Sequence, residues 1–208
     1  MRTLSLKQLK EVIQDIYNQK QKYDKKCSEN KSAIETMEQY MYSHLNQRYG
    51  LKNLIIEWAA AIINGIRRYS LEDADVALFG KIMRNECDED FRFVYSEVKA
   101  AILDLIKDKL KLRYRNKPEA EILNMVTNIQ AGYIEDWQWK DIINKMYNEE
   151  HAIILEQIIL DKISDLNKEV TKYRRKRTSE QLNAQQRRRI PFKHFQKVIY
   201  KVIMVDNT

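Results

Sequence analysis

Glycine, proline and cysteine are all scarce in this chain of 208 residues. It contains only four glycines, two prolines and two cysteines. Sheets depend on tight turns, and tight turns rely on the backbone freedom of glycine and the fixed φ of proline. The scarcity of both residues argues against a β-rich fold. We therefore predict an all-α protein with a multi-helix body and a long projecting C-terminal helix.

The two cysteines, Cys27 and Cys87, are too few and too far apart to suggest a disulfide framework or a zinc site. Their number fits a reducing compartment. The opening sequence MRTLSLKQLK lacks the apolar run of a signal peptide, and no run of 18 apolar residues is present. We therefore expect a cytoplasmic protein without a membrane span.

Motifs for common chemistries are also missing. The sequence has no Gly-rich phosphate loop and no Gly-x-Gly. Asp73 imitates the start of a calcium loop, but the positions that require an oxygen ligand, glycine and glutamate hold Ala77, Leu78 and Arg84. The acidic stretch that begins at Asp88 fails in the same way. We predict that the protein is not an enzyme and has no cofactor and no metal.

Apolar residues recur with helical spacing along most of the chain. The most apolar stretch, 51–69, carries Trp58 on a wide apolar stripe, which predicts the central core helix. The sequence SAIE at 32–35 is a capping box, which predicts that a helix starts at Ser32. A later stripe is formed by Ile154, Ile158, Leu166, Val170 and Tyr173.

These patterns suggest three parts. Residues 1–148 form a helical body. No Pro or Gly interrupts 133–190, so a helix over 149–190 would be ~50 Å long or more and would project from the body. Residues 191–208 form a short anchor, and the sequence leaves open whether it is a helix or a strand.

Positive charge is concentrated near the end of the chain. Residues 1–167 carry a net charge of −2, whereas 168–201 carry +10. Such asymmetry indicates a segment that binds a polyanion. We take the binding residues to be Arg174, Arg175, Lys176, Arg177, Arg187, Arg188, Arg189, Lys193 and Lys197. The alternative is a solvated charged helix without a ligand.

Four aromatic residues are candidates for anchoring a protein partner, because aromatic side chains are common anchors at interfaces. They are Trp137, Trp139, Phe192 and Phe195. For the two tryptophans, packing inside the domain is an equally good interpretation. The segment 187–204 also fits a calmodulin target, in which Phe195, Val198 and Val202 would be the apolar anchors.

Charge alone does not identify the partner. Arginine forks suit nucleic acid phosphates, the carboxylate-rich wall of a microtubule and an acidic lipid surface. The sequence therefore leaves these partners open.

Two stretches, Glu35–Ile66 and Phe79–Val94, resemble segments found in ciliary and flagellar proteins. The resemblance covers residues 4–110 and includes no catalytic signature. It implies an axonemal assembly subunit, a helical adaptor docked to other proteins or to the microtubule. Our interpretation is a structural scaffold in a cytoskeletal complex, with a nucleic-acid-binding or ribonucleoprotein subunit as the alternative.

Overall fold

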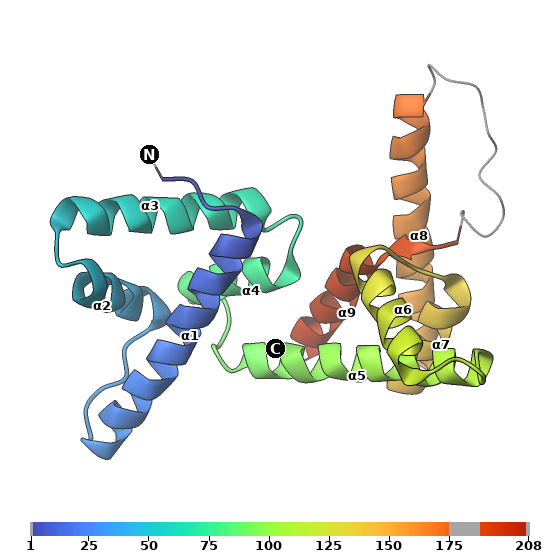
Figure 1. Ribbon diagram of the computed structural model, residues 1–208, viewed down its shortest axis with the longest axis horizontal. Coiled ribbons are helices and arrows are strands. Elements are labelled where there is room, and N and C mark those ends of the chain that lie inside the picture. The colour runs from blue at the N-terminus through green and yellow to red at the C-terminus, as the bar shows by residue number, and fades with distance from the viewer. Residues whose placement is uncertain (1, 175–187, 207–208) are drawn as a thin grey trace. The chain divides into compact units, whose positions relative to one another are not determined.

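The structure is a computed structural model that describes residues 2–174 and 188–206. Nine helices dominate this part of the chain, so the predicted all-α fold is confirmed. The chain forms two compact units, residues 1–94 and 95–208, and the boundary falls inside a helix. Each unit has its own helices, shown in blue to teal and in green to red in Figure 1. No helix within the described ranges is long and apolar enough to cross a membrane.

The first unit contains four helices that pack against one another: α1 (Leu6–Glu29), α2 (Met37–Tyr49), α3 (Lys52–Tyr69) and α4 (Ala74–Met83). Its core includes Leu9, Ile16, Met41, Ile62 and Phe79, one or more from each helix. Gly65 lets α1 and α3 approach closely, because a Cβ there would lie 3.1 Å from a methyl group of Leu9.

Local sequence sets the helix ends in this unit. Ser5 begins α1 through a capping box with Gln8, and Gly50 ends α2 with φ +64°. The predicted helix start at Ser32 is wrong, because the capping box that forms is Thr36 with Gln39.

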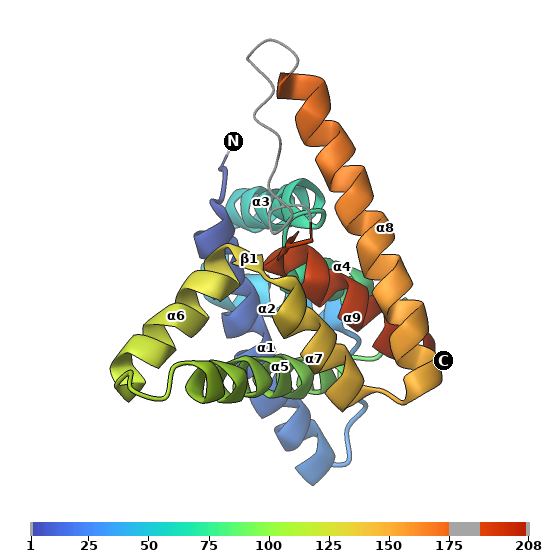
Figure 2. The ribbon, with the colours of Figure 1, turned by 90° about the vertical axis from the view of Figure 1, so that its right-hand side faces the viewer.

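The second unit begins in α5 (Phe91–Arg113) and continues through α6 (Glu119–Ala131), α7 (Asp136–Met146), α8 (Glu149–Arg174) and α9 (Phe192–Asp206). Two short strands, β1 (Tyr133–Ile134) and β2 (Ile190–Pro191), pair antiparallel, with Ile134 opposite Ile190. Helix α9 contacts α6, α8 and both strands, and Figure 2 shows it between α6 and α8. The segment after Pro191 is therefore a helix inside the core of this unit.

The predicted helix over 149–190 is not continuous to its expected end. Helix α8 is described as far as Arg174, residues 175–187 lie outside the described part, and Ile190 is in strand β2. The first turns of α8 pack in the core through Ala152, Leu155, Ile159 and Ile163. From Ser164 to Val170 its side chains are half-buried or exposed.

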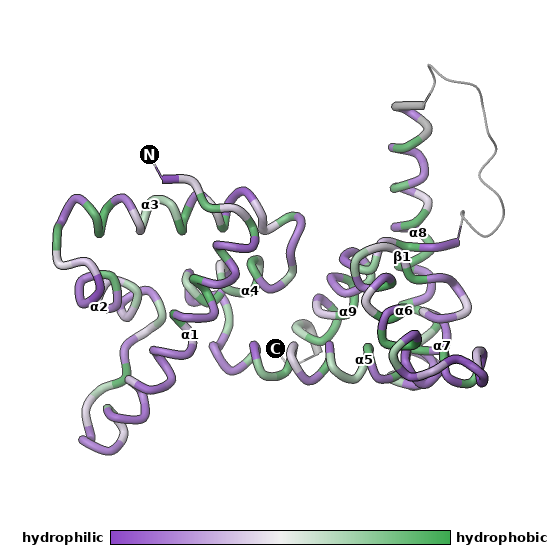
Figure 3. The backbone as a smooth tube through the Cα atoms, viewed as in Figure 1, coloured by the Kyte–Doolittle hydropathy of each residue, from purple (hydrophilic) through white to green (hydrophobic). Residues whose placement is uncertain are grey.

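The apolar stripe predicted for α8 is wrong at its start, although its member Leu166 packs partly against the core. Ile154 and Ile158 are 58% and 42% exposed, whereas Leu155 and Ile159 are buried. Hydrophobic and hydrophilic residues alternate along this helix in Figure 3. Two apolar faces are available in the sequence, and only packing against α7 and α9 selects one of them.

The helix over 51–69 is also less central than predicted. In α3 only Ala61, Ile62, Gly65 and Ile66 are buried, and Trp58 is half-buried. The wide apolar stripe of α3 therefore extends onto the surface.

A buried lysine completes the core of the first unit. Lys20 occupies an apolar position on α1, and its ammonium lies 2.7 Å from Asp24 and 3.0 Å from Glu89. Two carboxylates compensate for the burial of this charge.

Candidate functional site

Three of the four aromatic residues expected to anchor a partner lie inside the second unit. Trp139 and Phe195 are fully buried, and Phe192 is 2% exposed. On α9 the side chains of Phe192, Phe195 and Ile199 share one helical face, which packs into the core. These residues therefore anchor α9 to its own unit, and in this conformation they are not available to a partner. Because it is buried, Phe195 could not act as an apolar anchor for calmodulin in this conformation.

Trp137 is the exception. Its side chain is half-buried, and the guanidinium of Arg113 lies 4.3 Å from its ring centroid. This tryptophan is partly accessible, but an arginine of the same unit already covers its ring.

The buried Trp139 fixes the backbone at Arg188, one of the predicted anion-binding residues. Its indole N–H donates a hydrogen bond of 3.0 Å to the carbonyl oxygen of Arg188. The next residue, Arg189, places its guanidinium 4.1 Å from the ring centroid of Tyr133. Together with the pairing of β1 and β2, these contacts hold residues 188–191 against α7 and β1.

The predicted anion-binding residues differ in how far the structure describes them. The side chain of Arg174 lies outside the described part, as do Arg175, Lys176, Arg177 and Arg187. Arg188 and Lys193 are exposed, and Arg189 and Lys197 are half-buried. Arg188 lies 3.7 Å from Asp136, a long and solvent-exposed ion pair that contributes little stability.

Helices α8 and α9 bring additional positive charge together. His194 lies on α9 in the field of Lys193 and Lys197 from its own helix and of Lys162 from α8. Burial lowers the pKa of His194, the three lysines lower it further, and Glu169 acts in the opposite direction. We call Lys162, Lys193, His194 and Lys197 the basic cluster. It continues the charge of the basic stretch onto the folded surface of the unit.

Lys162 and His194 were not among the predicted site residues. His194 stands between Lys193 and Phe195, so its position in the basic stretch was visible. Lys162 is 32 residues away in sequence from His194, and only the packing of α8 on α9 brings it there.

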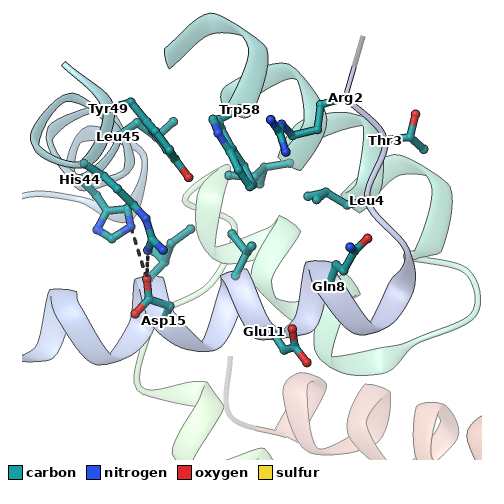
Figure 4. Close-up of a pocket in the computed structure, with 14 residues that line it drawn as sticks. Arg2, Thr3, Leu4, Gln8, Glu11, Asp15, His44, Leu45, Tyr49 and Trp58 are labelled. Carbon is teal, nitrogen blue, oxygen red and sulfur yellow. Dashed lines mark hydrogen bonds and ion pairs between the residues drawn. The ribbon is translucent and has the colours of Figure 1, made fainter. Parts of the chain in front are cut away.

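The first unit contains a cleft that sequence reasoning missed (Figure 4). Its volume is about 330 Å³, and it lies where α1, α2 and α3 meet the residues that precede α1. The cleft is lined by Arg2, Thr3, Leu4, Gln8, Glu11, Val12, Asp15, Ile16, His44, Leu45, Arg48, Tyr49, Trp58 and Ile62.

One wall of the cleft is polar. Asp15 accepts a hydrogen bond of 2.6 Å from Arg48, and the Nε2 atom of His44 lies 3.7 Å from the same carboxylate oxygen. Burial lowers the pKa of His44, and the effect of Arg48 in the same direction is opposed by Asp15. The imidazole is therefore held toward its neutral form.

Another part of the lining is aromatic. Tyr49 and Trp58 stack with ring centroids 5.1 Å apart and an interplanar angle of 13°. Arg2 places its guanidinium 4.4 Å from the Trp58 ring centroid. In Figure 4 Trp58 lies between Tyr49 and Arg2, so both of its faces are occupied.

The chain matches no protein-family model, and neither a curated protein nor a solved structure shows significant similarity to it. No functional residues can be transferred from a relative, and function has to be inferred from the residues of this chain.

Proposed function

We propose that this protein is a structural scaffold or adaptor subunit of a microtubule-associated, axonemal complex, and that it docks through its basic C-terminal region. Tubulin is the anionic partner in this proposal, and other proteins of the assembly contact the helical units. The axonemal assignment rests on the sequence resemblance in residues 4–110. The docking mode rests on charge.

The observation that supports docking is the basic cluster. Lys162 from α8 and Lys193 and Lys197 from α9 all lower the pKa of a partly buried histidine on α9, and the two helices pack against each other. Because α9 is anchored by Phe192 and Phe195, these charges are held on a folded surface. Positive charges on a folded surface favour the approach of an anionic partner. Lys193 and Lys197 also lie in residues 168–201, which carry the +10 excess, whereas Lys162 lies just before them.

Microtubule co-pelleting with the full chain tests this function. A first variant changes Lys162, Lys193 and Lys197 to Gln. We expect its affinity for microtubules to fall by about 10-fold at physiological salt, since three partly screened contacts contribute roughly 0.5 kcal/mol each. The difference in affinity between the wild type and the variant should be smaller at raised salt, because salt screens the lysine contacts that only the wild type makes.

A matched control changes Lys111, Arg115 and Lys117, which lie at the end of α5 and in the following loop, to Gln. It removes the same charge from the same unit and should keep the wild-type affinity. Circular dichroism checks that both variants retain their helices. A second variant changes Arg174, Arg175, Arg177, Arg187, Arg188 and Arg189 to Gln, and it should weaken binding further because it removes six positive charges.

Two results would contradict the proposal. If the wild type, the three-lysine variant and the six-arginine variant bind microtubules equally well and keep their helicity, the basic region is a solvated surface. Binding to RNA but not to microtubules, together with a high 260/280 nm ratio of the purified protein, would favour a nucleic-acid-binding subunit instead.

A further inference from the structure

The cleft of the first unit already holds a cation. The guanidinium of Arg2 lies over the Trp58 ring, and its Nε atom is 3.8 Å from a carboxylate oxygen of Glu57. Tyr49 stacks on Trp58 and supports that ring. An aromatic face beside a carboxylate is a favourable environment for a guanidinium, which is planar, weakly hydrated and attracted to the ring quadrupole. Trp58, which lines the cleft, and the neighbouring Glu57, which does not, thus form an arginine seat.

We propose that this seat binds an arginine side chain of a partner protein, and that Arg2 occupies it when the partner is absent. The rest of the cleft could contact the residue next to the partner's arginine. Among the apolar lining residues Val12 is half-buried and suits contact with an aliphatic residue next to the partner's arginine, whereas Leu4, Ile16, Leu45 and Ile62 are buried. The volume of about 330 Å³ is at the lower end of the range for ligand pockets. The ligand is therefore a short peptide segment with one arginine and an adjacent aliphatic residue.

The contacts that Arg2 makes with the seat are weak, so another arginine could replace them. The side chains of Arg2 and Glu57 are 42% and 35% exposed, and their separation of 3.8 Å is long for an ion pair. Exposed pairs of this sort are weak and easily exchanged with water or another cation. Arg48 and Asp15 are even more exposed, at 56% and 38%, but their separation of 2.6 Å is that of a short, charge-assisted hydrogen bond. We infer that Arg2 leaves the seat readily while Arg48 keeps the polar wall in place.

The proposal predicts competition inside the chain. The apparent dissociation constant equals the intrinsic value divided by the fraction of molecules with an empty seat. If Arg2 fills the seat for between two thirds and nine tenths of the time, removing its side chain should strengthen binding by about 3- to 10-fold. A merely structural Arg2 would have the opposite effect or none.

The experiment uses the full chain and a fluorescent tetrapeptide, Ala-Leu-Arg-Ala, with blocked ends. Fluorescence anisotropy measures its affinity. A second peptide carries citrulline, which keeps the shape of arginine and removes its charge. The chain variants are Arg2→Ala, Glu57→Gln and Trp58→Leu, and the matched control is Arg68→Ala. Arg68 also lies over an aromatic ring, that of Tyr69, but it does not line the cleft.

We expect Arg2→Ala to bind the arginine peptide more tightly than the wild type, and Arg68→Ala to bind it equally well. Glu57→Gln and Trp58→Leu should bind it more weakly while circular dichroism shows unchanged helicity. The citrulline peptide should bind weakly to every form.

The proposal is overturned if Arg2→Ala binds no better than the wild type, or if Arg68→Ala gives the same gain, which would indicate a general effect of net charge. Equal affinity for the arginine and citrulline peptides would also overturn it. None of these results depends on the basic cluster, so failure here leaves the docking proposal intact.

Discussion

Replacing Lys20 by methionine is expected to destabilise the first unit by about 2 kcal/mol. The side chain is only 2% exposed, and its ammonium donates to Asp24 at 2.7 Å and lies 3.0 Å from Glu89. Hydrogen bonds between charged groups contribute about 1.5–3 kcal/mol each. The two carboxylates are 23% and 24% exposed, so water replaces part of that interaction. Methionine retains the packing of the lysine stem, and the remaining loss is about 2 kcal/mol.

Urea denaturation combined with peptide-resolved hydrogen exchange measures this loss unit by unit. Peptides from α3 and α4 should exchange more easily in Lys20→Met, whereas peptides from α7 should not change. Lys22→Met provides the control, because Lys22 is an exposed residue on the same helix. Adding Asp24→Asn and Glu89→Gln to Lys20→Met should restore most of the stability, since no carboxylate is then left without its cation.

Alkaline pH gives a second measurement of the same ion pairs. Burial lowers the pKa of Lys20, but the bonds to Asp24 and Glu89 outweigh it, and the pKa is raised above 10.5. A raised lysine pKa adds stability that is fully present below pH 10.5 and is lost as the pH rises through the folded-state value. Lys20→Met should lack this loss. A cost below 0.5 kcal/mol, or one equal to that of Lys22→Met, would refute the reasoning.

Two further changes test the second unit. Phe195→Ala should lower the free energy of unfolding by about 3–5 kcal/mol in urea denaturation, because Phe195 is fully buried. The control Lys193→Ala, on the exposed side of α9, should have little effect. A small effect of Phe195→Ala would show that α9 is not part of the core. His194 has a pKa lowered by burial and by its three neighbouring lysines, so the stability it allows is present above pH 6.5 and is lost as the pH falls through the lowered value. Urea midpoints between pH 7 and pH 5 should therefore fall less steeply in His194→Gln, and an unchanged slope would contradict this assignment.

Helix ends were predictable where one local signal stands alone. Thr3 and Ser5 are both suitable caps for the first helix, and Ser5 begins it, while Gly50 ends α2 as a glycine at that position predicts. At the start of α2 two capping boxes lie four residues apart in the sequence, and nothing local decides between Ser32 and Thr36. The helix starts at the second, which leaves residues 32–36 outside α2.

The buried face of a helix was harder to predict than the helix itself. Helix α8 has apolar residues on more than one side, so periodicity alone did not distinguish Ile154 and Ile158 from Leu155 and Ile159. The aromatic residues of α9 were interpreted as partner anchors because aromatic side chains are common anchors at interfaces. Their positions on one face of the helix were compatible with either role, and packing against α6 and α8 decided it.

The candidate sites also contain some features that the sequence predicts and others that only packing creates. The excess of positive charge was visible in the sequence, whereas the approach of Lys162 to His194 depends on two helices packing together. Arg2 and Trp58 are 56 residues apart in sequence. No local pattern relates them, and only the meeting of the first residues with α3 forms the arginine seat.

The pairing of β1 with β2 and the burial of α9 have a consequence for synthesis of the chain. The first unit is made of residues 1–94, and because domains generally fold as units, we expect it to fold before the second. The core of the second unit stays incomplete until Phe192, Phe195 and Ile199 have been made, about 5–20 s after the start of α5 at typical rates of synthesis. During that interval the apolar faces of the second unit that pack on α9 lack that partner, and exposed apolar surface of this kind is prone to aggregation.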